Sequence, residues 1–271
     1  MKFVPKEIKN NVNISSKRPL GEFFLLLAGI LGIVILIYIA LGFTIDLVVS
    51  KLPPQVEGKL GKIYTDICER ARNPKFSQIE AELKRILYGL IKHTSWQNDC
   101  RVYVRDNDFA NAYVLPGNNI VVTTALLKEL NGEDEVAFVL AHELGHFVNR
   151  DHLRGLGRRL IFFIIAVSLG LDEQSEVILS GSLQDVEMKF SQTQERKADL
   201  FALQLLNKAY GNVRGAVEFF EKLKKWEKGG RFLYFFASHP SSLERIRYLK
   251  EEIIKNNYEE KEIIPWKKFE Y

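Results

Sequence analysis

Cysteine, histidine and methionine are scarce in this sequence. Its 271 residues hold two cysteines, five histidines and two methionines. Two thiols are too few for a disulfide-rich scaffold, and they do not match a zinc site built from four thiolates. The sequence also lacks internal repeats and low-complexity segments. These absences leave a globular protein long enough to bury a core, and we expect one domain with appendages.

Positive charge is also scarce once the first 22 residues are set apart. The formal net charge is +4. Residues 1–22 hold five basic and two acidic side chains, a net charge of +3, so only +1 remains for the rest of the chain. A nucleic-acid-binding protein is expected to carry its basic excess on the folded domain. We therefore do not expect nucleic acid to be a partner.

One long uncharged run, Phe23–Ile45, follows this basic tail. It has 23 residues and would span about 34 Å as a helix, enough to cross a bilayer core. Lys17 and Arg18 before the run predict a cytoplasmic N-terminus. We expect an uncleaved signal anchor, because a cleaved signal peptide has a shorter apolar region and a small-residue cleavage site. Residues 46–271 would then form an extracytoplasmic domain, on the periplasmic face in a bacterium.

A second apolar run, Leu160–Leu171, has only 12 residues. It would span about 18 Å as a helix, which is too short to cross a bilayer. We interpret it as a buried helix. A surface that lies against the membrane is the alternative, because the anchor would keep the domain beside the bilayer.

The two cysteines, Cys68 and Cys100, would lie in an oxidising compartment if the domain is extracytoplasmic. They could then form a disulfide, or they could be two buried free thiols. Their separation in space decides between the two, and the sequence does not give it.

The remaining pattern predicts an α+β domain dominated by helices, with a small β-sheet. Apolar residues recur at helical spacing in residues 52–72 and 76–93. Residues 100–106 alternate, and residues 111–124 are rich in β-branched side chains interrupted by a Pro-Gly pair, which indicates two or three short strands. Further helices are expected at 125–131, 133–149, 152–169, 173–184, 191–209, 213–227 and 242–256.

Three of the five histidines lie in one short stretch, VLAHELGHFVNRDH. Within it, His142 and His146 of H-E-x-x-H fall one helical turn apart on the same face, where two imidazoles can share one Zn²⁺. Glu143 is rotated by about 100°, off the ligand axis, as expected for the general base of a zinc-bound water. The bare pattern also occurs on solvated helices. Here the neighbours are apolar, and burying such side chains needs a reason.

A catalytic zinc needs a third protein ligand and one open position. His152 has the spacing of the third histidine of metzincins, with Asn149 at a position where a left-handed residue would end the helix. Glu195 is the second candidate, and Asp199 lies one turn further on the same face. Asp199 could hydrogen-bond the outer nitrogen of a ligand histidine. Otherwise, Glu195 and Asp199 would belong to a solvated charged face and His152 would begin the next helix.

Four motifs in order, NAYVLPG, HELGH, ERKAD and SHPSSLER, resemble the zinc peptidases related to the heat-shock protease HtpX and the CAAX prenyl endopeptidases. The resemblance covers roughly residues 52–250. It implies a zincin-like, gluzincin-type fold in which His142, His146 and Glu195 bind zinc and Asp199 supports them by hydrogen bonding. The well-known members span the membrane several times. This chain, with one convincing span, resembles the single-anchor and periplasmic relatives, which argues against a prenyl-protein role.

The metzincin alternative is weakened by this resemblance. It would also need a methionine turn beneath the zinc, and the only methionine downstream of the motif is Met188.

The outer motifs take roles from the same resemblance. His239 would stabilise the oxyanion or contact the metal-bound water, and Arg245 would orient the site. A strand lining the cleft would accept the substrate as an additional strand. The residues of this strand are Asn111, Ala112, Tyr113, Val114, Leu115 and Pro116. His93 matches no motif, and we interpret it as structural.

The sequence thus predicts a membrane-anchored metalloprotease with one Zn²⁺ per chain. The resemblance suggests a role in protein quality control, acting on misfolded or damaged membrane or envelope proteins. The expected partners are polypeptide substrates and, through the anchor, the lipid bilayer. One alternative is a chaperone or assembly factor whose zinc is latched by His239. The other is a metzincin-type peptidase that uses His152. The oligomeric state is not indicated.

Overall fold

The chain divides into two units near the end of its long apolar run. They are Met1–Asp46 and Leu47–Tyr271. The computed structural model describes residues 19–96, 98–168, 190–226, 235, 238–239 and 243–266. The helix α1, Pro19–Ser50, accounts for the described part of the first unit and ends four residues into the second.

The helix α1 has the length and composition of a membrane span. The candidate span, Leu20–Ser50, has 31 residues, and an 18-residue stretch of it has a mean hydropathy of 3.0 and no buried residue. It is the one helix in the described residues that is long and apolar enough to cross a bilayer, judged by length and composition alone.

The second unit contains a three-stranded sheet. Its strands are β1 (Arg101–Arg105), β2 (Ala112–Leu115) and β3 (Asn119–Thr123), in the order β1-β3-β2. β3 runs parallel to β1 and antiparallel to β2. Gly117 and Asn118 have φ values of 87° and 59° in the turn between β2 and β3, a conformation that glycine and asparagine tolerate best. The predicted small sheet is confirmed.

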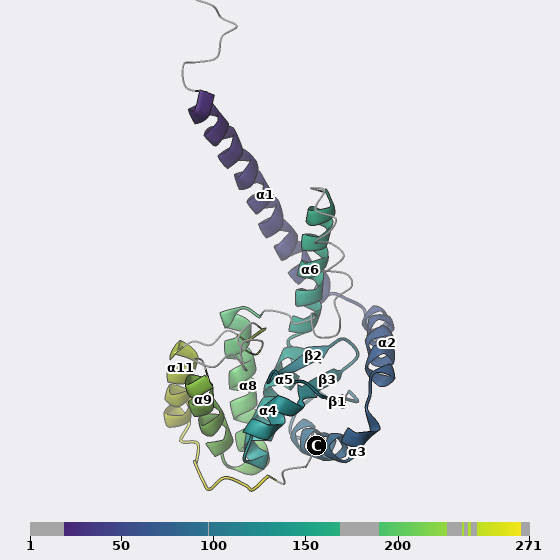
Figure 1. Cartoon of the computed structure of the whole chain (residues 1–271). Helices are drawn as coiled ribbons and strands as arrows, with labels where there is room; N and C mark the ends of the chain where they lie inside the picture. Colours follow the sequence, from purple (N-terminus) through teal and green to yellow (C-terminus); the bar gives the residue numbers. More distant parts are fainter. Residues whose placement is uncertain are drawn as a thin grey trace, which may run out of the picture. The chain divides into compact units, whose positions relative to one another are not determined.

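Helices make up most of the second unit, as predicted (Figure 1). The predicted helix at 173–184 and Met188 lie outside the described residues. The helices are α2 (Pro54–Arg70), α3 (Ser77–Ile91), α4 (Thr124–Glu129), α5 (Glu133–Val148), α6 (Asp151–Ser168), α8 (Gln192–Tyr210), α9 (Arg214–Trp226) and α11 (Leu243–Lys255), with a short 3₁₀ turn at Pro74–Phe76.

The central helix of the second unit is α5. It packs against α8 on one side and against β2 on another (Figure 1). Gly145 makes the approach of α8 possible, because a Cβ atom at this position would lie only 3.0 Å from the Ala198 Cα. The close contact of α5 with α8 brings the H-E-x-x-H turn next to the first turns of α8.

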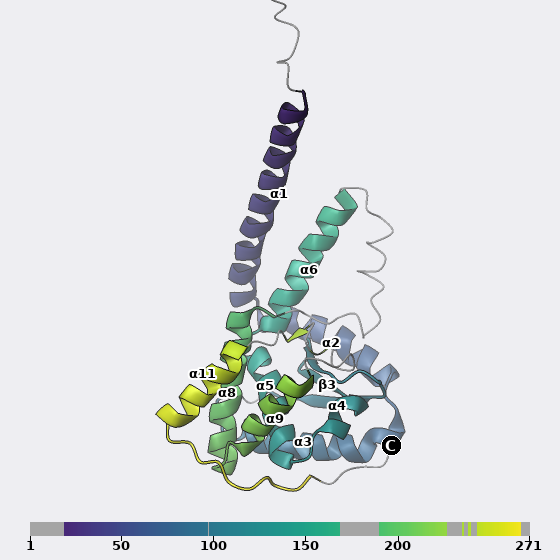
Figure 2. The same cartoon turned by 60° about the vertical axis from the view of Figure 1, so that its left-hand side comes forward.

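The prediction of a buried helix at Leu160–Leu171 is wrong for its described part, Leu160–Ser168. Leu160, Ile164 and Val167 of α6 are 56%, 54% and 42% exposed. Among the residues of α6 whose burial is described, only Asp151 to Leu153 are buried. Figures 1 and 2 both show α6 extending beyond the sheet and the helices α5 and α8. Hydropathy predicted the helix but not whether other parts of the unit cover it.

The two cysteines are buried free thiols. Cys100 belongs to the main hydrophobic core, whereas Cys68 packs with Tyr103 and Tyr113 on the other face of the sheet. Burial raises the pKa of the Cys68 thiol to about 11 and that of the Cys100 thiol to about 12. Both therefore stay protonated at neutral pH.

Candidate metal centre

Four buried side chains converge inside the second unit. His142 and His146 come from α5, Glu195 from the first turn of α8, and His239 from the segment before α11. One donor atom from each lies within 4.8 Å of the other three. Imidazole nitrogens and a carboxylate oxygen are the donors that zinc prefers alongside thiolates. The group is therefore a candidate metal centre.

Neighbouring donor atoms in this group are spaced like ligands of one metal ion. The His142 Nε2 lies 3.2 Å from the His146 Nε2 and 3.3 Å from the His239 Nδ1. The Glu195 Oε1 lies 3.4 Å from the His146 Nε2 and 3.0 Å from the His239 Nδ1. Tetrahedral zinc with ligand distances of about 2.0–2.1 Å requires donor separations of about 3.3–3.4 Å. The residues present thus fit a zinc ion.

The start of α8 fixes the position of Glu195. Ser191 and Gln194 form a capping box, in which the Ser191 Oγ accepts from the Gln194 N–H at 3.3 Å and the Gln194 Oε1 accepts from the Ser191 N–H at 2.9 Å. Glu195 and Asp199 then lie one turn apart on the face that meets α5.

Two carboxylates hold the outer nitrogens of the histidine pair. The Asp199 Oδ1 lies 2.9 Å from the His142 Nδ1, and the Asp151 Oδ2 lies 3.0 Å from the His146 Nδ1. A proton held between Nδ1 and each carboxylate leaves Nε2 free to bind a metal.

Sequence reasoning expected this contact from Asp199 but missed Asp151. Arg150 has a φ of 56° and turns the chain sharply between α5 and α6, which brings Asp151 back to His146. The expected left-handed residue was Asn149, but its φ is −81°. The sequence signal that could have predicted this contact is an aspartate five positions after His146, just beyond the end of the helix.

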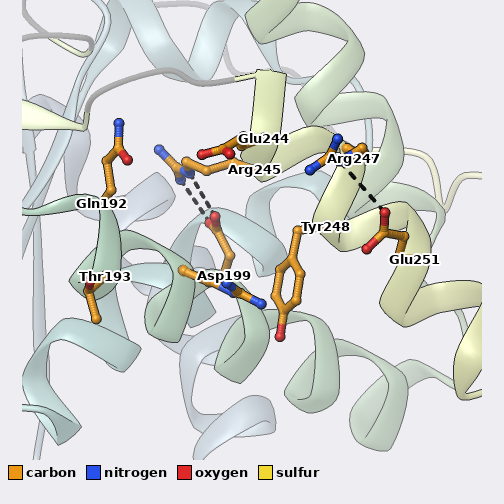
Figure 3. A pocket seen from close by; sticks show the side chains of 9 residues that line it. Gln192, Thr193, Asp199, Glu244, Arg245, Arg247, Tyr248 and Glu251 are labelled. Carbon is orange, nitrogen blue, oxygen red and sulfur yellow. Dashed lines mark hydrogen bonds and ion pairs between the residues drawn. The ribbon is translucent and has the colours of Figure 1, made fainter.

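Arg245 ties α11 to the same carboxylates. Its Nη1 lies 2.7 Å from the Glu195 Oε2, and its Nε donates to the Asp199 Oδ2 at 2.7 Å. Figure 3 shows the paired contact with Asp199, at the edge of a polar cavity of about 330 Å³ between α8 and α11. An arginine that pairs with two buried carboxylates fixes their positions and stabilises their ionised forms.

The electrostatics of the centre favour charged carboxylates. Burial alone would raise the pKa of Glu195, but the positive charges of His239 and Arg245 hold it well below its usual range. Burial lowers the pKa of His142, which favours the neutral ring that a metal needs. For His146, burial is outweighed by Asp151 and Glu195, which raise its pKa to about 9. A metal must therefore displace a proton from this ring.

Glu143 lies beside the four donor residues and is not one of them. Its side chain is buried, and its Oε1 is 3.5 Å from the His239 Nε2. Its Oε2 has no hydrogen-bond partner among the described residues. A buried carboxylate oxygen with no protein partner, next to a metal-type donor set, can exchange a proton with a bound water.

The edge strand β2 reaches the centre through one backbone carbonyl. The His239 Nε2 lies 3.3 Å from the Ala112 O. Ala112 and Val114 face the main core, whereas Tyr113 and Leu115 pack on the opposite face with Cys68. The flanking residues serve the hairpin: Asn111 bonds to Thr123 of β3, and the Pro116 O accepts from Asn119.

His152 and His93 lie outside the donor group. The ring of His152 is buried 4.9 Å from the ring of Phe147, and its nearest acidic contact is Glu57 at 3.9 Å. His93 is exposed. The structure therefore brings Glu195, and not His152, to the histidine pair.

A buried H-E-x-x-H pair, a glutamate from a later helix and an adjoining edge strand are the parts of a zincin-like metallopeptidase site. Comparison with known proteins agrees. Residues 77–253 match the model of peptidase family M48, which is more than half of the chain. The protein belongs to peptidase family M48, and the resemblance inferred from the four motifs is confirmed at the level of the family.

Several relatives carry protease names. The chain is 31% identical over 195 residues to the mitochondrial metalloendopeptidase OMA1 of Schizosaccharomyces pombe, covering 69% of this chain and 56% of the relative. It is 29% identical over 191 residues to the metalloprotease YcaL of Escherichia coli, covering 68% and 72%. It is 29% identical over 133 residues to the beta-barrel assembly-enhancing protease of Yersinia pestis, covering 45% and 27%. The chain thus spans little more than half of that OMA1.

Proposed function

We propose that this protein is a membrane-anchored zinc metalloendopeptidase. The observation that carries the proposal is the convergence of four buried donors, from α5, α8 and the segment before α11, to within 4.8 Å of one another. Family membership supports the peptidase activity. His142, His146 and Glu195 would hold the zinc ion. When bound there, zinc supplies a Lewis acid that lowers the pKa of water towards about 7 and polarises a peptide carbonyl.

Glu143 would be the general acid and base. Its Oε2 would take a proton from the attacking water and deliver it to the nitrogen of the leaving amine. Asp199 and Asp151 would keep the two histidines in the tautomer with Nε2 unprotonated, and Arg245 would hold Glu195 and Asp199 in their charged forms.

The polypeptide substrate would bind along β2. An extended peptide can pair with the main chain of an edge strand and needs little side-chain identity to do so. The Ala112 carbonyl is the point where β2 comes nearest to the donor group. This mode suits an endopeptidase that acts on unfolded segments of many sequences.

The substrates and the location follow from the anchor. With α1 in a membrane and the basic tail in the cytoplasm, the second unit would lie outside the cytoplasm. Misfolded or damaged membrane and envelope proteins would then be the substrates within reach. The names of the relatives, one mitochondrial and one concerned with beta-barrel assembly, support a membrane setting.

The test is the substitution Glu143→Gln in the full chain, purified in detergent. We expect one zinc per chain to be retained and the cleavage of unfolded casein to fall by about 10²–10⁴-fold, because a neutral amide cannot accept the proton. Glu221→Gln on the exposed face of α9 is the matched control and should keep wild-type activity. Wild-type turnover in Glu143→Gln would remove Glu143 from the proposed role.

A second candidate function is a latched form with little proteolysis, such as a chaperone. It is favoured by the His239 Nδ1, which occupies the fourth corner of the donor group, 3.0 Å from Glu195 and 3.3 Å from His142. If His239 closes the centre, His239→Ala should retain zinc and cleave casein faster. A loss of about 10²–10³-fold would assign His239 to the oxyanion instead.

A further inference from the structure

The far end of α6 is an apolar helix tip on which three large side chains are exposed among the described residues. We define the tip as Leu160–Ser168. It contains no charged residue, and Leu160, Ile164 and Val167 are among the exposed large hydrophobic residues of the described chain. Exposed apolar side chains that follow one another along a helix mark a surface that binds something apolar. Figures 1 and 2 show the tip standing clear of α5, α8 and the sheet.

The start of α6 is hydrogen-bonded to the last turn of α1 and to the residues that follow it. Arg150, the residue before α6, donates from its Nη1 to the Val49 O at 3.0 Å and to the Leu52 O at 3.4 Å. Its Nη2 pairs with Glu57 at 3.3 Å. Val49 is buried and lies in the last turn of α1, within the second unit. The helix with the exposed tip therefore starts beside the last turn of α1, which belongs to the second unit.

The length and composition of the tip suit one leaflet of a bilayer. Its nine residues span about 14 Å, and the hydrocarbon of one leaflet is about 15 Å thick. The Ser168 Oγ donates to the Ile164 O at 2.7 Å, which satisfies a carbonyl of the last turn that lipid could not. Basic residues come just before the tip, as in helices that enter an anionic interface. They are Arg154, Arg158 and Arg159.

We propose that the α6 tip inserts into one leaflet of the membrane that holds α1 and gives the second unit another attachment to it. The proposal rests on the proposed role of α1 as an anchor. Asp151, which contacts His146, begins α6, and Leu160 is nine residues further on. Asp151, which holds the proposed ligand His146, would then lie within about 14 Å of the apolar layer. Polypeptide segments immediately next to the bilayer would be the substrates.

The test uses the full chain in lipid nanodiscs, in which both faces of the bilayer meet the buffer. A polarity-sensitive fluorophore is attached at Ile164→Cys, and the matched control is Ile254→Cys on α11, where the side chain is 76% exposed. The native thiols of Cys68 and Cys100 are 0% exposed, so the reagent labels the introduced cysteine. We expect lipids with doxyl groups on their acyl chains to quench the label at 164 several-fold more than the label at 254. Iodide in the buffer should show the opposite order.

Two results would overturn the proposal. Iodide quenching at 164 equal to that at 254 would leave the tip in water. Protection of 164 from both quenchers would mean that protein covers it, either this chain or a second copy. Val167→Cys repeats the measurement about one turn further along the helix. The readout does not depend on peptide cleavage, so its failure is distinct from a failure of the peptidase assignment.

Discussion

Helices α5 and α6 are neighbours in the chain but meet opposite surroundings. In α5, two histidines are buried because their Nδ1 atoms meet carboxylates from α6 and α8. In α6, leucine, isoleucine and valine are exposed because the described residues beyond its first turns do not cover them. In these two helices, burial is decided by the groups that neighbouring elements supply, and not by the hydropathy of the side chain. Polar groups are buried where chemistry needs them, and apolar groups are exposed where a second, apolar medium is expected.

The largest expected effect is on the free energy of unfolding, and it should differ between truncations in α5 and in α6. Leu140→Ala in α5 removes a side chain that is 1% exposed and should lower the free energy of unfolding by about 2–5 kcal/mol. Leu160→Ala in α6 should change it by less than about 0.5 kcal/mol, since this position is on the surface. Denaturant titration of the full chain in detergent measures both. Equal losses would mean that α6 packs against protein.

The next effect tests whether the two helices share the metal centre through Asp151. Asp151→Ala should weaken zinc binding by about 10–100-fold, because the His146 Nδ1 loses its acceptor. Asp199→Ala should act in the same way on His142. Competition with a chelator of known affinity gives the zinc dissociation constant. Asp108→Asn, in the loop before β2, is the control. An unchanged dissociation constant in Asp151→Ala would confine the centre to α5, α8 and the segment before α11.

The smallest effect concerns pH and the junction between the two helices. Burial lowers the pKa of His152 to about 3, and neither ring nitrogen has a hydrogen-bond partner among the described residues. Above about pH 6.5 the ring is neutral in both folded and unfolded chains. Below that pH the His152 ring takes up a proton in the unfolded chain but not in the folded chain. The free energy of unfolding therefore decreases as the pH decreases. Between pH 7.5 and 5.0 the loss should be about 2 kcal/mol.

His152→Leu should remove this contribution. The test is therefore the difference between the pH profiles of unfolding for the wild type and the variant. Parallel profiles would show that His152 is not held neutral in the folded protein.

Spacing in the sequence could predict the helix that carries the histidine pair, but not the third ligand. The H-E-x-x-H helix was predictable at 133–149 because its histidine spacing and apolar period agree, and it is found at Glu133–Val148. Spacing alone left Glu195 and His152 as rivals. The choice depends on the close contact of Gly145 with Ala198, a tertiary feature that brings α8 to the pair.

The remaining differences also lie in tertiary structure. Asp151 contacts His146 because Arg150 adopts a left-handed conformation, which a bulky residue rarely signals in sequence. The exposure of Leu160, Ile164 and Val167 depends on which elements reach them, and the apolar run carries no such information. Local pattern thus predicted the elements and the motif. Which charged side chains pair between different elements could be determined only from the structure.

The most direct test of the metal centre is the zinc content of the intact chain by native mass spectrometry. We expect one zinc per wild-type chain, loss of the metal in His142→Ala and Glu195→Ala, and retention of one zinc in His152→Ala. A folded wild-type chain without zinc would contradict this expectation. So would a Glu195→Ala chain that keeps its metal while His152→Ala loses it.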